Sequence, residues 1–349
     1  MIKVSIVARE KVGGVEYHRL EIPFVNMVND YDVSFTNLVS GLEFKPDLVI
    51  ANRTISLYGF DSCLKEIEYL KTNNIPYILD LDDYWVLGKD HILHQHYKDL
   101  RMAEQILVSI INASCVWVTN EVLADKVKQH NSNVIIIPNA IDFNQPQFKL
   151  NRKTSGPIHV GWSGSTTHVK DVEILEQSFK QLHRDKSLMK RYKVLMAGWH
   201  HDVNEMLQME KSFTGNYKAT PDHYERIPAV DVYNYANHYN HFDIALCPLV
   251  DNTFNNCKSF LKALEAGAKG CAVIASNVHP YNDLLVHGET AILIDKHRNE
   301  KGWYNEIKKL INNPLKIKEL SLNLHNVVKE NYNIKTINII RKQSINNTL

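Results

Sequence analysis

Residues 242–276 read FDIALCPLVDNTFNNCKSFLKALEAGAKGCAVIAS, and this segment is the most informative one about the architecture. An apolar run ends at Pro248, a polar loop follows, apolar residues then recur at helical spacing, and a second apolar run ends at Ser276. Asn255 or Asn256 is suited to begin the helix, and Gly270 to end it. A strand, a helix and a second strand in this order form one unit of a parallel sheet.

The same alternation extends over the whole chain. A polar stretch at 151–157 divides the strand-like runs into two series. The runs before it are 3–8, 33–36, 48–51, 77–80, 116–119 and 134–138. The runs after it are 158–162, 192–197, 244–248, 272–275 and 291–294. Residues 300–342 have helical spacing. We therefore predict an α/β protein with two Rossmann-like domains, 1–150 and 151–330, whose parallel sheets face a central cleft where ligands bind.

Composition excludes several classes of protein. The 349 residues are 44% hydrophobic with a net charge of +1, and no apolar run approaches the roughly 20 residues of a membrane span. The five cysteines form no CxxC pair, which disfavours a disulfide scaffold and a cysteine metal site. Residues 2–8 resemble a first strand rather than a signal peptide, so we expect a cytoplasmic protein without a transmembrane segment.

Charge is uneven along the chain. Residues 1–150 contain 14 Lys and Arg against 19 Asp and Glu, whereas residues 296–349 contain 11 against 4. The basic tail is either a solvated helix face, a surface that contacts the acidic first half, or a docking surface for a phosphate-rich partner.

Two glycine-containing loops are candidates for binding a nucleotide. Gly13 and Gly14 follow the first strand and precede a helix, so their backbone amides can approach a ligand, although a tight turn without a ligand explains the pair as well. The second domain begins with a strand that ends in Gly161-Trp-Ser-Gly-Ser-Thr-Thr-His168. We expect the loop residues Ser163, Gly164, Ser165 and His168 to contact a diphosphate.

The helix predicted within 242–276 supplies a third candidate. Lys258 and Glu265 are seven residues apart, which places them on one helix face about 10 Å apart. Lys258, at the positive end of that helix, is suited to a diphosphate, and Glu265 to ribose hydroxyls. Asn256 and Ser259 flank Lys258 and join it as predicted donor contacts.

Residues 242–276 resemble the GT-B glycosyltransferases of the retaining group-4 type. The resemblance includes a segment before them, Ile137-Pro-Asn-Ala-Ile-Asp142, and one after them, His287-Gly-Glu-Thr-Ala-Ile-Leu-Ile294. The resemblance is clearest over 135–335. It implies transfer of a sugar from a UDP- or GDP-sugar to an acceptor hydroxyl with retention, no cofactor and no metal, and a tail, 331–349, that packs back on the first domain. Glu265 matches the second glutamate of the family's Glu-x7-Glu pair, and Cys257 occupies the position of the first.

The acceptor half offers its own candidates. Asp80-Leu-Asp82-Asp83 has the Asp-x-Asp pattern with which metal-dependent GT-A transferases hold Mg²⁺ or Mn²⁺, but the nucleotide-like loops lie after residue 160, so we assign Asp82 or Asp83 to the acceptor and predict no metal site. His91 is a candidate general base among three nearby histidines.

The donor base is expected near Ile227. This residue lies in the segment 224–228, which follows the loop after the predicted strand at 192–197. The acceptor is a carbohydrate, a glycolipid, a protein or modified DNA. The alternatives to a transferase for a carbohydrate, glycolipid or protein acceptor are a transferase for hydroxymethylated DNA bases, an epimerase of the same fold, and an inactive nucleotide- or carbohydrate-binding relic, which Cys257 keeps open.

Overall fold

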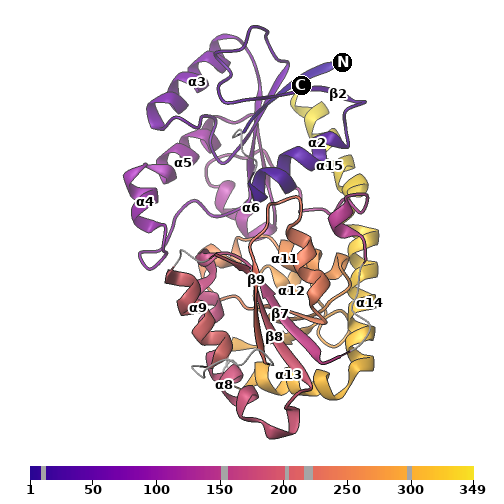
Figure 1. Cartoon of the computed structure of the whole chain (residues 1–349). Coiled ribbons are helices and arrows are strands. Elements are labelled where there is room, and N and C mark those ends of the chain that lie inside the picture. Colours follow the sequence, from indigo (N-terminus) through magenta and orange to yellow (C-terminus); the bar gives the residue numbers. More distant parts are fainter. Residues whose placement is uncertain (9–12, 151–155, 201–203, 216–222, 297–300) are drawn as a thin grey trace. The chain divides into compact units, whose positions relative to one another are not determined.

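The computed structural model describes residues 1–8, 13–150, 156–200, 204–215, 223–296 and 301–349. These residues form two compact units (Figure 1). Unit 1 consists of Met1–Asp142, Asn256–Ser259 and Tyr332–Leu349, and unit 2 of Phe143–Asn255 and Phe260–Asn331. Loop residues 9–12 and most of the predicted linker, 151–155, lie outside the described residues.

Unit 1 is built around one parallel sheet of six strands in the order β2-β1-β3-β4-β5-β6. Its strands are β1(Ile2–Val7), β2(Tyr31–Thr36), β3(Leu48–Asn52), β4(Tyr77–Leu81), β5(Cys115–Val118) and β6(Val134–Ile136). Its helical elements are α1(Gly14–Glu16), the π-helical η1(Tyr17–Glu21), α2(Ile22–Val25), α3(Phe60–Thr72), α4(His94–Asp99), α5(Met102–Asn112), α6(Glu121–Val127) and α15(Ile334–Thr348).

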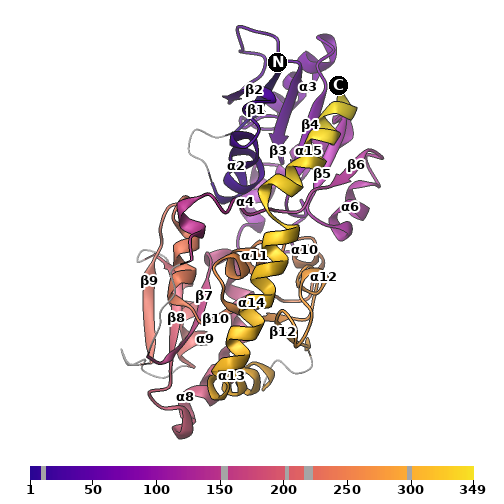
Figure 2. The same cartoon turned by 90° about the vertical axis from the view of Figure 1, so that its right-hand side faces the viewer.

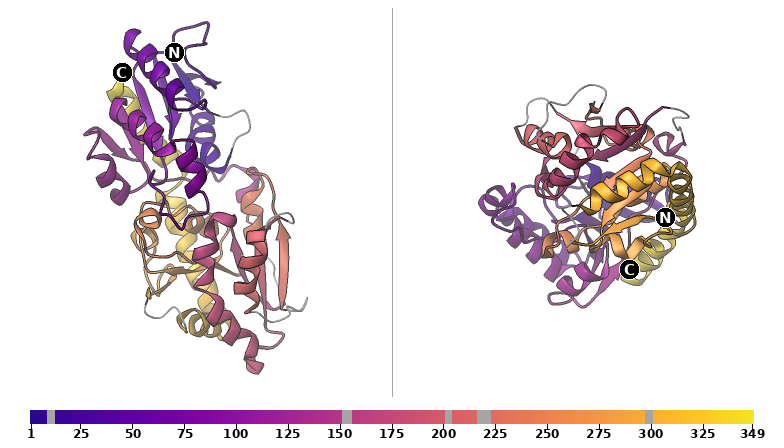
Figure 3. Two further views of the ribbon diagram at one scale, coloured as in Figure 1. Left: turned by 90° about the vertical axis from the view of Figure 1, so that its left-hand side faces the viewer. Right: turned by 90° about the horizontal axis from the view of Figure 1, so that it is seen from below.

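Helices cover both faces of this sheet, which explains why its central strands are buried and mostly apolar. β3 and β5 have no exposed residue. Figures 1 and 2 show α3 and α5 on one face and α2 and α15 on the other. The tail is bonded to this unit, because Asn338 on α15 donates to Pro23 O at 2.9 Å and Ser344 accepts from Trp117 Nε1 at 2.7 Å. Both chain ends therefore lie on unit 1 (Figure 3).

Unit 2 contains a second parallel sheet of six strands, in the order β12-β11-β10-β7-β8-β9. The strands are β7(Ile158–Ser163), β8(Tyr192–Trp199), β9(Tyr224–Pro228), β10(Ile244–Cys247), β11(Ala272–Ser276) and β12(Ile292–Ile294). The helices are α7(Val169–Glu173), α8(Glu176–Arg184), α9(Asn204–Thr214), α10(Thr253–Asn256), α11(Leu261–Ala268), α12(Tyr281–Leu284), α13(Gly302–Asn312) and α14(Pro314–Asn331), with short 3-10 turns η2(Pro146–Phe148), η3(Thr166–His168), η4(Lys186–Leu188) and η5(Tyr235–His241).

The order of strands in unit 2 reverses between β7 and β10, which are neighbours in the sheet. In unit 1 the corresponding reversal lies between β1 and β3. In open parallel sheets a ligand binds beyond the carboxyl ends of the strands at such a reversal. The topology therefore directs attention to the segments after β7 and β10 in unit 2, and after β1 and β3 in unit 1.

The prediction of two parallel α/β sheets is confirmed, and each predicted strand is present with bounds that differ by at most two residues. One strand was missed: β9 pairs with β8 at the edge of the sheet of unit 2. Its sequence, Tyr-Glu-Arg-Ile-Pro, is charged and ends in proline, as is common at a sheet edge.

The single helix predicted from Asn255 or Asn256 to Gly270 is wrong. Two helices, α10 and α11, occupy this stretch, and residues 257–260 separate them. The side chain that begins α10 is Asn252, whose Oδ1 accepts from Asn255 N at 2.9 Å. Lys258 therefore lies outside any helix and three residues before α11, so the predicted face shared by Lys258 and Glu265 does not exist.

Candidate active site

The loop after β7 is the first part of the candidate site in unit 2. It begins at Ser163, which is buried, and continues through Gly164 to the exposed Ser165. A Cβ on Gly164 would lie 2.5 Å from the indole of Trp162 and 2.8 Å from Lys262 Nζ. A Cβ on Gly198, at the end of β8, would collide with Gly164 O. Only glycine fits at both positions, so the backbone of this loop is held closely between β8 and α11.

Lys262 projects from the first turn of α11 toward this loop. Its Nζ donates to Ser163 O at 2.6 Å and lies 5.2 Å from the centre of the Trp162 ring. The ammonium group is thus placed where a strand, a glycine loop and a helix N-terminus meet. A positive charge beside backbone amides is suited to a phosphate group.

Glu265 follows Lys262 by one helical turn on α11 and is only 2% exposed. Tyr239 on η5 donates its hydroxyl to Glu265 Oε2 at 3.3 Å. Burial, and then the Glu265 carboxylate, raise the pKa of both Tyr235 and Tyr239. Both phenols stay protonated at neutral pH and can act as hydrogen-bond donors.

Ser163 is connected to the same element. Its Oγ lies 2.9 Å from His238 Nδ1, and His238 Nε2 lies 3.0 Å from Pro228 O. A carbonyl oxygen can only accept, so Nε2 carries the proton and Nδ1 accepts from the Ser163 hydroxyl. Burial lowers the pKa of His238, which agrees with a neutral ring. η5 thus contacts the loop after β7 and α11 at once.

Asp171, on α7, fixes the loops around the site. Its Oδ2 is 2.8 Å from His168 Nδ1, and its Oδ1 accepts from Val250 N and Asn255 Nδ2, both at 2.9 Å. The carboxylate is 3% exposed and receives three bonds from two loops. It therefore fixes His168 and the segment after β10, at the reversal of the strand order.

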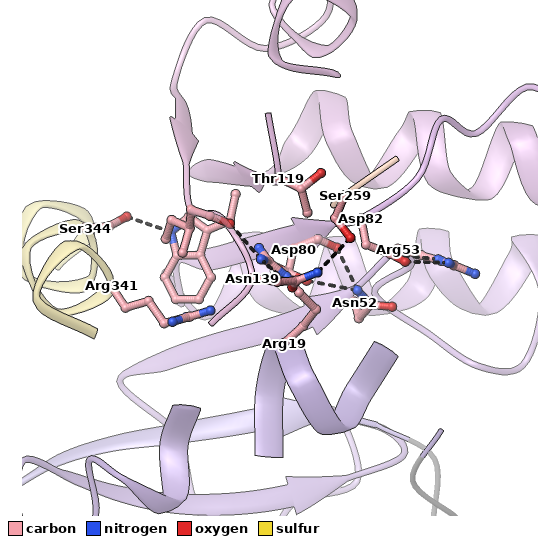
Figure 4. Close-up of polar contacts among 12 residues, drawn as sticks. Arg19, Asn52, Arg53, Asp80, Asp82, Thr119, Asn139, Ser259, Arg341 and Ser344 are labelled. Atoms are coloured by element: carbon pink, nitrogen blue, oxygen red, sulfur yellow. Dashed lines mark hydrogen bonds and ion pairs between the residues drawn. The ribbon is translucent and has the colours of Figure 1, made fainter. Parts of the chain in front are cut away.

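Unit 1 has a separate polar cluster at the carboxyl ends of its strands (Figure 4). Arg19, 1% exposed, donates through Nε and Nη2 to the carboxylate of Asp80, which is fully buried at the end of β4. Its Nη1 donates to Ile137 O at 2.6 Å and to Asn139 Oδ1 at 3.2 Å. Asn139 Nδ2 in turn donates to Ser259 Oγ at 2.8 Å.

A second arginine in unit 1 pairs with the next two carboxylates. Arg53, after β3, adopts a left-handed φ of 64° and donates to Asp82 at 2.7 and 2.8 Å and to Asp83 at 2.9 Å. Burial alone raises the pKa of Asp82, but the pairing with Arg53 outweighs it and leaves that pKa below its usual value. Burial and the Asp82 charge raise the pKa of Asp83, and Arg53 and Lys258 oppose this rise.

Residues 257–259 belong to unit 1, although most of the chain around them belongs to unit 2. Asn120 begins α6 by accepting from Leu123 N at 2.9 Å, and its Nδ2 donates to Cys257 O and Lys258 O at 3.0 and 2.8 Å. These carbonyls bond to a side chain instead of to a helical N–H, which is the physical reason for the break before α11.

The remaining predicted residues lie as follows. Gly13 is the N-cap of α1 and Gly14 its first residue, as expected, while the loop before them is outside the described residues. His91 precedes α4, where its Nδ1 accepts from Leu93 N at 3.1 Å. Ile227 is half-buried on the edge strand β9, and Asn256 is the last residue of α10.

Cys257 is fully buried among apolar side chains of unit 1, and burial raises the pKa of its thiol to about 11. It is a packing residue with no thiolate at neutral pH. The position where the resembling family has its first glutamate therefore holds a side chain directed into a core.

Sequence reasoning gave no site role of their own to Arg19, Arg53, Lys262 or Asp171. An arginine beside the apolar stretch Leu20-Glu-Ile-Pro-Phe24, and an aspartate inside the apolar strand β4, were the available indications of a buried pair. In the part of the chain that the structure describes, no three His, Cys, Asp or Glu side chains gather in a way that could hold a metal ion. None of the helices among these residues is long and apolar enough to cross a bilayer.

The sequence of unit 2 resembles one family of known proteins. The family model described as Glycosyl transferases group 1 matches residues 157–313. None of the curated proteins matches the sequence significantly.

Solved structures resemble the chain over nearly its full length. Sucrose-phosphate synthase from Thermosynechococcus elongatus is 14% identical, with a TM-score of 0.69 and 99% of each chain covered. A glycosyltransferase from Rickettsia africae ESF-5 is 14% identical, with a TM-score of 0.68, 99% of this chain and 98% of that chain covered. Anabaena HepE in complex with UDP and glucose is 12% identical, with a TM-score of 0.66, 99% of this chain and 100% of that chain covered. The expected resemblance to GT-B glycosyltransferases is thereby confirmed at the level of the fold, and residues 157–313 match the group 1 glycosyl transferase family.

Proposed function

We propose that this protein is a glycosyltransferase that moves a sugar from a UDP- or GDP-sugar to an acceptor hydroxyl, with retention at the anomeric carbon and without a metal ion. The observation that carries the proposal is the placement of Lys262 and Glu265 on the first two turns of α11, beside the Ser163-Gly164 loop at the reversal of the strand order. HepE was solved in complex with UDP and glucose, which makes UDP-sugars the first donors to test.

In this proposal Lys262 and the amides of the Gly164-Ser165 loop bind the donor diphosphate. Negative charge grows on this group as its bond to the sugar breaks, so a fixed ammonium and preorganised amides lower the barrier. Glu265, buried and close to Tyr239, accepts hydrogen bonds from ribose hydroxyls. Lys258 stays a proposed second cation, now on the segment before α11 and not on the helix itself.

The acceptor is assigned to the polar cluster of unit 1, with Asp82 as its proposed contact and His91 as the proposed base. The carboxylates of the Asp80-x-Asp82 pattern pair with Arg19 and Arg53. A carboxylate paired with a guanidinium is a poor ligand for a divalent cation, which supports a reaction without metal. Turnover that persists in EDTA is the expected result.

The donor assignment is tested by thermal unfolding with UDP, GDP, ADP and TDP. A nucleotide at about 100 times its Kd adds roughly 2.7 kcal/mol to the free energy of unfolding, which raises the Tm by a few degrees. We expect one nucleotide to stabilise the wild type and Glu265→Gln to lose at least about tenfold in affinity, because a neutral amide is a weaker acceptor for ribose hydroxyls.

Glu306→Gln is the matched control, since Glu306 is a buried glutamate of the same unit on α13. It should bind the nucleotide as the wild type does. If no nucleotide stabilises the wild type, the donor proposal is wrong and the chain is a relic that has kept the fold. A steeply salt-dependent gel shift on duplex DNA would instead favour modified DNA as the acceptor.

A further inference from the structure

Lys269 is a buried lysine that bonds to the segment by which the chain enters unit 2. It is 2% exposed, and its Nζ donates to Gln147 O and to Lys149 O, each at 2.6 Å. Burial lowers the pKa of Lys269 to about 8, so the ammonium is protonated at neutral pH and both bonds are charge-assisted. A buried ammonium is costly unless such partners are present.

Lys269 is also the C-cap of α11. Its backbone N donates to Glu265 O at 3.0 Å, so one residue closes the last turn of the helix that holds Glu265 and also binds the entry segment, residues 143–150. A second contact acts at the same helix end. His325 Nδ1 lies 3.1 Å from both Gly267 O and Ala268 O, and Phe143 packs edge-to-face on the His325 ring with the ring centres 5.8 Å apart.

Gln147 joins the entry segment to η5. It is 3% exposed, its Oε1 accepts from Ala236 N at 2.9 Å, and its Nε2 donates to Val232 O at 3.3 Å. Ala236 is the second residue of η5, which also contains His238 and Tyr239. The entry segment is therefore bonded to both elements whose side chains form the candidate donor site.

We propose that Lys269 and Gln147 are positioning residues for the donor site: they fix the entry segment to α11 and η5 and so hold Glu265 and Tyr239 in register. The proposal rests on the proposed function for its activity readout. A change in the path of residues 143–150 would reach the donor site through these two side chains, without any contact between them and the nucleotide. The structure thus contains a route by which the path of the entry segment influences donor affinity.

The test compares Lys269→Met with His183→Phe in the full chain. His183 is a residue of unit 2 that bonds to Tyr192 and Phe213 O, outside the donor site. Both substitutions should lower the Tm. Only Lys269→Met should weaken nucleotide binding, by about tenfold, when the Kd is measured at a temperature well below the Tm of both variants. Equal Kd values for Lys269→Met and wild type would overturn the proposal.

A double-mutant cycle separates positioning from general loosening. Lys269→Met and Tyr239→Phe should have non-additive effects on nucleotide affinity, because both act through Glu265, whereas His183→Phe and Tyr239→Phe should add. Gln147→Leu, combined with Tyr239→Phe, should show the same non-additive effect on nucleotide affinity as Lys269→Met does. Additive effects for Lys269→Met would contradict the proposed route.

Amide hydrogen exchange distinguishes failure of this inference from failure of the proposed function. If the wild type binds no nucleotide, exchange at residues 235–241 and 261–268 still reports how firmly η5 and α11 are held. Lys269→Met should exchange faster than wild type in both segments, and His183→Phe in neither. Unchanged exchange in Lys269→Met would refute the positioning role whatever the protein binds.

Discussion

Lys262 is the residue in which charge, helix position and backbone contact coincide. Its ammonium is bound to a carbonyl of the loop after β7 and lies against an indole ring, so its rotamer is already restricted before a ligand arrives. A preorganised cation loses little conformational entropy on binding a phosphate. The buried Glu265, one turn later, has its own donor in Tyr239.

Lys262→Met should therefore weaken nucleoside diphosphate binding by about tenfold or more and leave nucleoside binding nearly unchanged, because the lost interaction is with phosphate. Isothermal titration with UDP and with uridine measures both affinities. Lys308→Met, which removes a pair with Asp185 at 2.6 Å in the same unit, is the control. Equal losses for UDP and uridine would show that Lys262 supports the fold of the site rather than the diphosphate.

Arg19 and Arg341 are two buried arginines whose charges affect one another. Both guanidinium groups are buried in unit 1, and Arg19 takes the Asp80 carboxylate in a bidentate pair. Burial, and then repulsion from Arg19, lower the pKa of Arg341 to about 9. Asp80 therefore compensates the charge of Arg19, and its removal would leave a buried guanidinium without its counter-ion.

At the scale of elements, the interruption between α10 and α11 is the feature that matters most. In a continuous helix, each carbonyl of this segment would accept from the backbone N–H four residues later. Cys257 O and Lys258 O instead accept from the side chain of Asn120, and Asn139 adds a bond to Ser259 Oγ. Two asparagines of unit 1 thus determine the path of the segment that leads into α11.

Asn120→Asp tests this role without removing the helix cap. The carboxylate can still accept from Leu123 N, but it cannot donate to the two carbonyls and repels them. We expect a loss of about 1–3 kcal/mol of unfolding free energy, because the carbonyls of residues 257 and 258 lose their partner, and we expect lower turnover. Asn333→Asp, at the cap of α15, is the matched control. Equal stability and turnover in the two variants would contradict the role assigned to Asn120.

The sequence predicted the strands far better than the polar contacts. Buried parallel strands are continuous apolar runs, as in Leu48–Ala51, and can be recognised locally. The break at residues 257–260 depends on Asn120, 137 positions before Cys257, and the pairing of Arg19 with Asp80 joins residues 61 positions apart. Helical spacing alone therefore predicted a continuous helix, because the competing partner is visible only in three dimensions.

At the scale of the whole molecule, the two sheets have the same kind of strand order. Each has six parallel strands and one reversal of order, and in each sheet polar residues lie at or directly after the end of one strand beside the reversal. In unit 1 these are Asn52 and Arg53 at the end of β3, and in unit 2 Ser163 at the end of β7. The proposed division of donor and acceptor between two units follows from this repeated architecture.

Part of the stability toward acid should come from unit 2, where burial lowers the pKa values of His183 and His238 below 6.5. Each ring is neutral and bonded to a backbone carbonyl, Phe213 O or Pro228 O. Between the lowered pKa and 6.5, the unfolded chain binds more protons than the folded chain. The contribution of these histidines to the free energy of unfolding is therefore complete above pH 6.5. It is lost as the pH falls from 6.5 through the pKa of the folded state. Urea unfolding at pH 7.5 and 5.5 should show this loss, and it should shrink in His238→Gln and His183→Gln but not in the exposed His96→Gln. A wild-type loss that neither buried-site variant reduces would mean that other groups control the acid response.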